Sequence, residues 1–418
     1  MRKSTFIIIL ALVLLIIGIF FGYYFFFLNK PAGDAGTESQ NGFPNIGGNL
    51  GDGTGTQNDE TGFGGTGVNQ GEAVVPRLRQ ISDVPTAGMA FKEVSSAREK
   101  IPSYIRWIER ATGHVYETRT DTLNKRRISN TTIPKIYEAV GVDNGGGFVL
   151  RYLKDDDSIQ SYYIKLPETA TSSLTQGVEK PVEGTFLQKN ILGLAVSPAT
   201  NRLFSLIKNE NSSSGIVSET NGAKRVSVWS SPAVEWLVNW PEEKTIILNT
   251  KPSASTPGFA YTLNPQTFEL REIIGNIEGL TTLLSPDKSY LFYSGNNGNS
   301  PYLRILDAKT HQSENLSLVT LPEKCAWSTL SKGLLYCAIP KTIPAGLYPD
   351  SWYEGSLSFD DELWSIDVVT GTTKVVLSKN EIPRGSSFDI TNPVLNKDET
   401  YLLFNNKNDL TLWGLRLK

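Results

Sequence analysis

From residue 76 to the end of the chain, apolar residues occur in short runs rather than in long helical stripes. The runs are rich in Val, Ile, Leu, Tyr, Phe and Trp, and Gly, Pro, Asn or Asp separate them. Such runs predict many short β-strands joined by tight turns. The stretch from Val94 to Arg110 is the exception, because its spacing also suits one short helix. The pattern therefore predicts an all-β domain over residues 76–418.

A two-part unit recurs along this domain. In its first half a Ser-Pro-Asp turn, or an equivalent, joins two apolar strands, most clearly from Leu283 to Tyr293. In its second half a strand leads through a Thr-Gly turn into another strand, as from Leu363 to Leu377. Four strands that recur every roughly 40–60 residues are typical of a propeller blade, so the sequence predicts a seven-bladed β-propeller, with six or eight blades as alternatives. The fourth strands are predicted to end near Ile81, Ile128, Phe186, Val228, Ile274, Leu318 and Leu377.

The turn from Leu284 to Asp287 resembles the repeat motif of the PD40/TolB-type WD40-like propeller family. This resemblance extends over nearly all of residues 76–418, and it implies the propeller fold and a tendency to bind partners. It supplies no catalytic residue. The larger pattern also resembles uncharacterised membrane-anchored envelope proteins of small-genome bacteria, which implies no activity.

The N-terminal segment has the composition of a membrane anchor. Phe6 to Leu28 contains no charged side chain, and as a helix it would span roughly 34 Å, enough for a bilayer core of about 30 Å. Arg2 and Lys3 precede it, which favours a cytoplasmic N-terminus and an extracytoplasmic body. We therefore predict a transmembrane signal anchor over residues 1–30 and a location at the cell membrane. A cleaved signal peptide is the alternative, but its apolar stretch is usually only about 7–15 residues long.

Residues 31–75 are predicted to form a disordered linker. They contain 13 of the 37 glycines and few large apolar side chains, so they cannot bury enough surface to offset the entropy of ordering. A flexible coil of this length has an end-to-end distance of roughly 35–40 Å. The match to G-x-G-x-x-G at Gly62 to Gly67 lies in this linker, without the strand and helix that a dinucleotide site requires.

Charge excludes one class of partner. Three basic residues lie in 1–30 and six acidic residues in 31–75, which leaves 37 of each sign in residues 76–418. A body without net charge is not expected to bind nucleic acid, which requires a concentrated basic surface.

No catalytic, metal or cofactor site is predicted. His114 and His311 are both predicted at the same hairpin-turn position, and no G-x-S-x-G nucleophile elbow is present. Asp155 to Asp157 is interpreted as a solvated hairpin tip rather than a calcium site. The leading hypothesis is a module that binds protein or envelope glycan, or serves as a scaffold. The alternative is a glycan hydrolase or lyase at the central mouth of the propeller, for which adjacent Asp360 and Asp361 are candidate carboxylates.

Two predictions concern how the domain is held together. The C-terminal run from Leu410 to Leu417 supplies a third strand but leaves no residues for a fourth, so Pro76 to Ile81 is expected to pair beside it and close the ring. Cys325 and Cys337 flank a predicted hairpin and are expected to lie directly opposite each other, within reach of a disulfide. Two buried thiols are the alternative.

The candidate ligand site is an insertion in the sixth unit. The chain runs from Pro340 to Asp361 before the third strand begins, which is longer than the equivalent loops. Loops on a rigid scaffold often carry recognition, and aromatic residues flanked by acids suit a partner or a sugar. The alternative is a structural plug in which Trp352 covers the rim of its own blade. The candidate residues are Tyr348, Asp350, Trp352, Tyr353 and Glu354.

Overall fold

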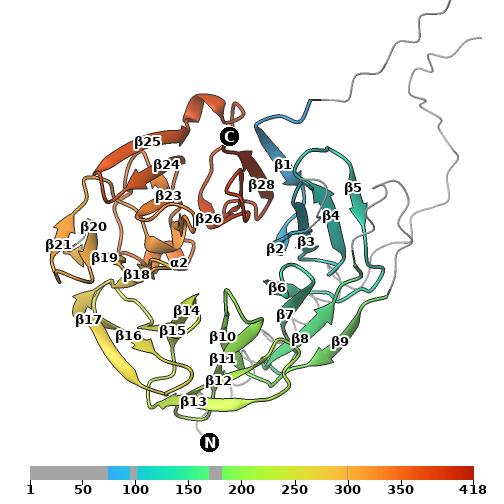
Figure 1. Ribbon diagram of the computed structural model, residues 1–418, viewed down its shortest axis with the longest axis horizontal. Coiled ribbons are helices and arrows are strands. Elements are labelled where there is room, and N and C mark those ends of the chain that lie inside the picture. Colours follow the sequence, from blue (N-terminus) through green and yellow to red (C-terminus); the bar gives the residue numbers. More distant parts are fainter. Residues whose placement is uncertain (1–73, 95–100, 169–180, 299) are drawn as a thin grey trace, which may run out of the picture. The chain divides into compact units, whose positions relative to one another are not determined.

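A computed structural model describes residues 74–94, 101–168, 181–298 and 300–418, and the statements below concern these residues. They form seven four-stranded antiparallel sheets arranged as blades around a central axis (Figure 1). The predicted seven-bladed β-propeller is therefore confirmed. No helix in these ranges is long and apolar enough to cross a membrane, and the predicted anchor over residues 1–30 lies outside them.

The blades follow one another along the chain, and each begins with the strand nearest the axis. Blades 1 to 3 consist of β2 (Thr86–Lys92), β3 (Tyr104–Glu109), β4 (Val115–Arg119) and β5 (Lys125–Arg127); β6 (Ile136–Val142), β7 (Gly147–Leu153), β8 (Ile159–Lys165) and β9 (Glu183–Phe186); and β10 (Ile191–Val196), β11 (Arg202–Lys208), β12 (Ser213–Glu219) and β13 (Val226–Ser231). Blades 4 and 5 consist of β14 (Trp236–Glu242), β15 (Thr245–Thr250), β16 (Pro257–Leu263) and β17 (Leu270–Glu278); and β18 (Thr281–Leu284), β19 (Tyr290–Asn297), β20 (Ser300–Asp307) and β21 (Ser313–Asn315).

Blade 6 consists of β22 (Cys325–Trp327), β23 (Leu334–Pro340), β24 (Asp361–Asp367) and β25 (Thr372–Leu377). Blade 7 combines β26 (Ile390–Leu395), β27 (Tyr401–Asn406) and β28 (Leu412–Arg416) with β1 (Leu78–Ser82). Three short helices lie between strands: η2 (Pro322–Lys324), α2 (Asp350–Tyr353) and η3 (Lys379–Glu381).

The ring is closed by the N-terminal strand, as predicted. β1 pairs antiparallel with β28, with Leu78 opposite Leu415 and Ser82 opposite Leu412. Figure 1 shows these two strands side by side next to blade 1. This pairing protects the edge that β28 would otherwise expose.

The hydrophobic core lies between neighbouring blades, because each sheet packs its faces against the sheets beside it. One buried cluster joins blades 1 and 2, another blades 6 and 7, and a third blades 7 and 1. Trp413 is buried in the cluster between blades 6 and 7, and Trp364 packs against the one between blades 5 and 6. The two tryptophans therefore occupy equivalent positions between blades.

Hydrogen bonds from second strands also join consecutive blades. Arg151 donates to the carbonyl oxygen of Ile191 at 2.9 Å, and Asn249 donates to that of Leu280 at 3.0 Å. Near the axis the backbones approach closely: a Cβ atom at Gly88 would lie 1.8 Å from the carbonyl oxygen of Ala139. The blades are thus held in a fixed arrangement.

Strand order defines the two faces of the propeller. The first strand of each blade runs from one face to the other, so turns between first and second strands lie on one face, which we call the entry face. Val74 and Val75 lie there, lining one cavity together with the turn residues Leu330 and Lys397. The loops between second and third strands, and the links between blades, lie on the opposite face, which we call the insertion face.

Two predictions of local structure were wrong. Tyr104 to Glu109 forms strand β3, not part of a helix; five of its six residues are buried, so the alternation that marks a strand is hidden. His114 and His311 do not share a turn position. His114 lies between the second and third strands of blade 1, on the insertion face, whereas His311 lies between the third and fourth strands of blade 5, on the entry face.

Candidate binding site

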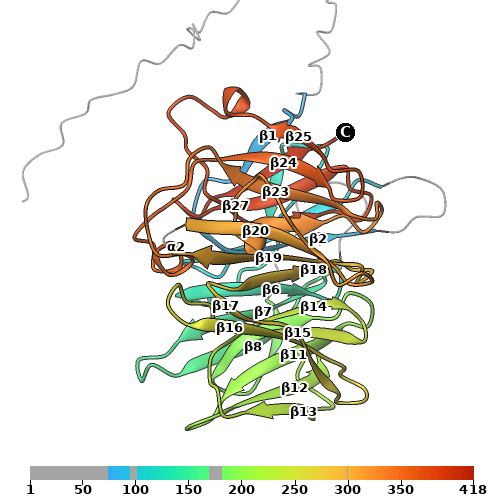
Figure 2. The ribbon, with the colours of Figure 1, turned by 90° about the vertical axis from the view of Figure 1, so that its left-hand side faces the viewer.

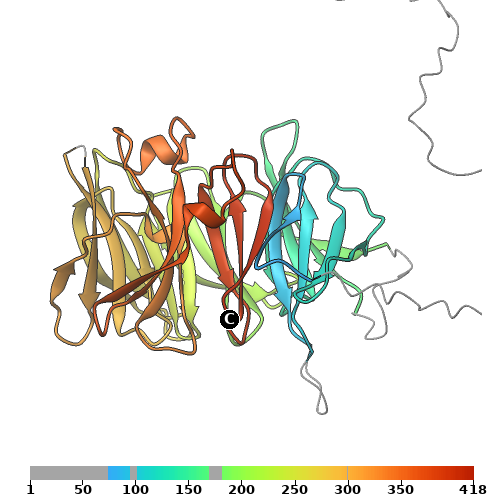
Figure 3. The ribbon, with the colours of Figure 1, turned by 90° about the horizontal axis from the view of Figure 1, so that it is seen from above.

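The insertion, residues 341–360, joins β23 to β24 on the insertion face. It contains the single-turn helix α2, which stands out from the blades in two side views (Figures 2 and 3). Its bounds agree with the predicted connection from Pro340 to Asp361. The loop is therefore an addition to blade 6 rather than part of its sheet.

An apolar cluster fills the space beneath the insertion. It contains Tyr348, Trp352 and Phe359 from the insertion and its C-terminal end, together with Leu321 from the preceding link. The rings of Tyr348 and Phe359 are stacked, with centroids 5.9 Å apart and planes 10° from parallel. Because the side chains of Tyr348 and Trp352 are 2% and 5% exposed, the insertion has a packed core of its own.

Three fully buried charges lie next to this cluster. The ammonium group of Lys324 forms ion pairs with Asp361, at 2.8 Å, and with Asp389. Asp389 also accepts hydrogen bonds from the indole N–H of Trp352 at 3.0 Å and from the backbone N–H of Phe359 at 3.1 Å. The carboxylate of Asp389, whose ion pair with Lys324 links blades 6 and 7, thus also holds the insertion in place.

Asp361 accepts fewer hydrogen bonds than Asp389 does. One oxygen accepts a hydrogen bond from the backbone N–H of Ile390 at 2.7 Å, and the other has no hydrogen-bond partner. Burial raises the pKa of Asp361 to about 6, although the nearby Lys324 lowers it. The pKa of this carboxyl therefore lies well above its ordinary value of 3.8.

Further contacts fasten the insertion to blades 4, 5 and 7. Asp350 accepts a hydrogen bond from the backbone N–H of Ala254 in blade 4 at 2.5 Å. Asn296 in blade 5 donates to the carbonyl oxygen of Tyr348, and Lys407 in blade 7 donates to that of Trp352 at 2.5 Å. The insertion is therefore attached to four consecutive blades, which limits its freedom to move.

The five predicted site residues do not form one surface. Tyr348 and Trp352 point into the apolar cluster, as the structural-plug alternative describes for Trp352, and Asp350 is bound to blade 4. Tyr353 and Glu354 are exposed. Tyr353 is 37% exposed while its hydroxyl donates to Glu323, so the accessible part is the ring.

Sequence reasoning missed two features of the insertion. Leu347 is 53% exposed on it, and the buried charges of Lys324 and Asp389 support it from below. The sequence carries no signal for this ion pair, because its partners lie 65 residues apart in different blades. Leu347 is one of many apolar residues in the chain, and only its exposure distinguishes it.

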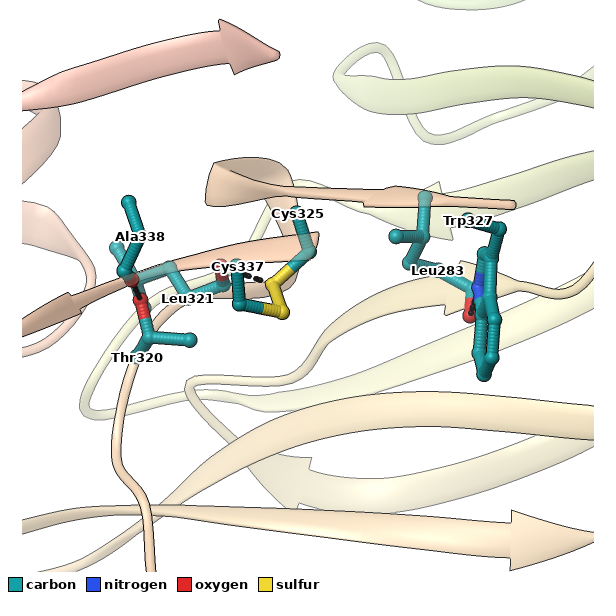
Figure 4. Close-up of a disulfide and its surroundings, with 7 residues drawn as sticks. All are labelled: Leu283, Thr320, Leu321, Cys325, Trp327, Cys337 and Ala338. Carbon is teal, nitrogen blue, oxygen red and sulfur yellow. Dashed lines mark hydrogen bonds between the residues drawn. A yellow bond between two sulfur atoms is a disulfide. The ribbon is translucent and has the colours of Figure 1, made fainter. Parts of the chain in front are cut away.

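The two cysteines lie on β22 and β23, close to the insertion. Cys325 is directly opposite Cys337 in the strand register, and the structure joins them in a disulfide (Figure 4). Both side chains are buried. The cross-link holds the first two strands of blade 6 together immediately after Lys324.

The central channel of the propeller contains a large cavity. It has a volume of about 1120 Å³, and its walls come mainly from β2, β6, β10 and β26. Its carboxylates are engaged: Glu138 pairs with Arg151, while Asp143 accepts a hydrogen bond from Tyr163 at 2.9 Å. Among the described residues, no group of three or more His, Cys, Asp or Glu side chains is placed to hold a metal ion.

The candidate carboxylates Asp360 and Asp361 do not face a common cavity. Asp361 is buried against Lys324, whereas Asp360 pairs with Lys379 at 2.6 Å. Asp155 to Asp157 form an exposed turn between β7 and β8, as interpreted from the sequence.

Comparison with known proteins assigns no family to the chain. No protein-family model and no curated protein matches the chain. Among solved structures, an oligogalacturonate lyase in complex with manganese is similar at 12% identity and a TM-score of 0.44, over 80% of this chain and 97% of that one. TolB from Acinetobacter baumannii is similar at 10% identity and a TM-score of 0.42, over 78% of each chain. The β-propeller domain of the Trilobed protease from Pyrococcus furiosus is similar at 9% identity and a TM-score of 0.47, over 80% and 97%.

Proposed function

We propose that this chain is a membrane-anchored β-propeller of the PD40/TolB type, displayed outside the cytoplasmic membrane. In this proposal it binds a protein or glycan of the cell envelope through its insertion face. The observation that carries the proposal is the placement of two features on opposite faces. The chain enters the propeller beside Val74 on the entry face, and the insertion stands on the other.

This arrangement suits a tethered receptor. A linker attached at the entry face does not cover the insertion face, which stays accessible to a partner. On that face the insertion presents Leu347 and the ring of Tyr353, while Glu354 lies beside them. Apolar and aromatic side chains on a rigid support can anchor a partner without a large entropy cost of ordering.

The test is capture of envelope components by the full-length protein in detergent extracts. The variant Leu347→Ser with Tyr353→Ser removes the exposed apolar groups of the insertion. The matched control, Phe268→Ser with Val369→Ser, removes two similarly exposed residues (51% and 58%) from the entry face.

We expect the insertion variant to lose capture by about 30-fold, because an interface hot spot contributes roughly 2 kcal/mol or more. The control should retain it, and both proteins should keep near-normal melting temperatures. Unchanged capture by the insertion variant, or an equal loss in the control, would overturn the proposal. Parallel capture experiments with envelope protein and with isolated envelope glycan identify the class of partner.

The enzyme alternative remains a glycan hydrolase or lyase at the mouth of the channel. Its test is the release of new reducing or unsaturated ends from envelope glycan. Turnover that Glu138→Gln abolishes, in a protein with an unchanged melting temperature, would favour that alternative over simple binding.

A further inference from the structure

A large cavity on the entry face lies between blades 6, 7 and 1 and has a volume of about 1160 Å³. We propose that it binds the headgroup of an anionic phospholipid. The inference rests on the proposed membrane anchoring, but on a different face and different residues from the partner site.

A buried cation lies behind the wall of this cavity, in contact with residues that line it. The guanidinium of Arg79, on β1, donates to Tyr401 at 2.9 Å and to the carbonyl oxygens of Arg119 and Thr122. All three acceptors belong to residues that line the cavity, and all are neutral. Arg79 is 6% exposed and has no carboxylate partner among the described residues. Its charge is therefore poorly screened and makes the potential of the cavity positive.

Exposed cations add to this potential. Lys397, Arg416 and Lys418 line the cavity, and none of them forms an ion pair within the described part of the chain. Burial raises the pKa of Tyr401, while the positive charges of Arg79 and Arg416 beside this phenol lower it. The cavity thus offers several positive groups to one ligand.

The acids of the cavity wall are used within the wall. Glu93 accepts hydrogen bonds from the hydroxyl of Ser103 at 2.9 Å and from the backbone N–H of Lys397 at 3.1 Å. Asp398 accepts one from Thr400 at 2.7 Å. Asp121 pairs with Arg119, another residue of the wall. These carboxylates hold the loops in place, and the four basic residues of the lining outnumber its three acids, so the cavity favours an anion.

The rest of the lining indicates that the anion carries an apolar part. Val74, Ile101, Leu123 and Leu330 line the same cavity, and Leu123 and Leu330 are 45% and 62% exposed. A phospholipid combines a phosphate with such a part. The chain also enters the propeller here, at Val74, so a predicted anchor would lie within the reach of its linker, roughly 35–40 Å.

The test uses the full-length protein in nanodiscs of phosphatidylcholine with or without phosphatidylglycerol. The readout is hydrogen exchange of the cavity loops, residues 119–124 and 396–400. The charge-reversal variant is Lys397→Glu with Arg416→Glu. The matched control is Lys189→Glu with Lys208→Glu, two exposed lysines on the insertion-face side.

We expect phosphatidylglycerol to slow exchange in both loops of the parent protein and of the control. Charge reversal should weaken the association by at least about 30-fold, since each of the two basic residues lost is worth about 1 kcal/mol near an anionic surface and the two glutamates add repulsion. Equal exchange in both lipids, or slowing that survives charge reversal, would overturn the proposal. Slowing by inorganic phosphate in phosphatidylcholine discs would instead reassign the cavity to a soluble phosphate ligand. Failure to insert into nanodiscs would refute the anchoring itself, and failure of capture by the insertion face would leave this result intact.

Discussion

Replacing Lys324 with methionine should destabilise the propeller strongly. Methionine has a similar length and fills the space, but it leaves Asp361 and Asp389 as two buried carboxylates without their cation. Removing one partner from a buried ion pair typically costs about 3–5 kcal/mol. At roughly 2 °C per kcal/mol for a domain of this size, the melting temperature should fall by about 6–10 °C.

The assay is thermal unfolding of the full-length protein, followed by circular dichroism. Lys251→Met is the matched control, because Lys251 pairs with Glu235 at 2.8 Å but is 55% exposed. An exposed pair contributes about 0–1 kcal/mol, so the control should melt within about 2 °C of the parent protein. Limited proteolysis should cut within residues 341–360 more readily in Lys324→Met. Equal melting of parent, control and Lys324→Met would refute the assignment of this ion pair as the support of the insertion.

Three further predictions concern pH, closure and the disulfide. Because burial raises the pKa of Asp361 from 3.8 to about 6, the stability contributed by its protonated form is full below pH 3.8 and is lost as the pH rises through 6. Asp361→Asn should remove this pH dependence of the melting temperature, and a variant whose profile between pH 5 and 7 matches that of the parent protein would contradict the assignment. Deletion of residues 76–82 should lower the melting temperature sharply by exposing β28, whereas an unchanged melt would argue against closure by β1. Cys337→Ala should lower the free energy of unfolding by up to about 3 kcal/mol. Thiol labelling of the denatured, unreduced parent protein should find no free cysteine, and two free thiols would exclude the cross-link.

The blade architecture could be predicted because each blade repeats the same local signals. Turns such as Ser285 to Asp287 show where the first strand of a blade ends. In blade 6, the expectation that Cys325 lies opposite Cys337 already indicates the register between the first two strands. Closure was predictable for the same reason: the last unit lacks a fourth strand, and the chain supplies one near Arg79.

The support of the candidate site could not be predicted in this way. Lys324 meets Asp389 across a blade boundary, and no local pattern encodes which buried charge meets which. The burial of Trp352 likewise depends on the packing of the insertion as a whole, so an aromatic residue in a long loop was compatible with both a ligand contact and a plug. The turn assignment of His114 was wrong because both kinds of hairpin turn in a blade use the same residues.

The two proposed faces predict a measurable coupling. In the proposed arrangement, a flexible linker of about 45 residues would let the body rotate, so partner capture at the membrane would be limited by the fraction of time that the insertion face points outward. A headgroup held in the entry-face cavity would remove that freedom, and a tether raises the effective concentration of nearby lipid to the millimolar range, so a weak contact suffices. Lys397→Glu with Arg416→Glu should therefore reduce capture of a large partner by anchored protein in anionic nanodiscs, yet leave capture in detergent unchanged. Equal loss in detergent would show that the two faces communicate through the fold instead.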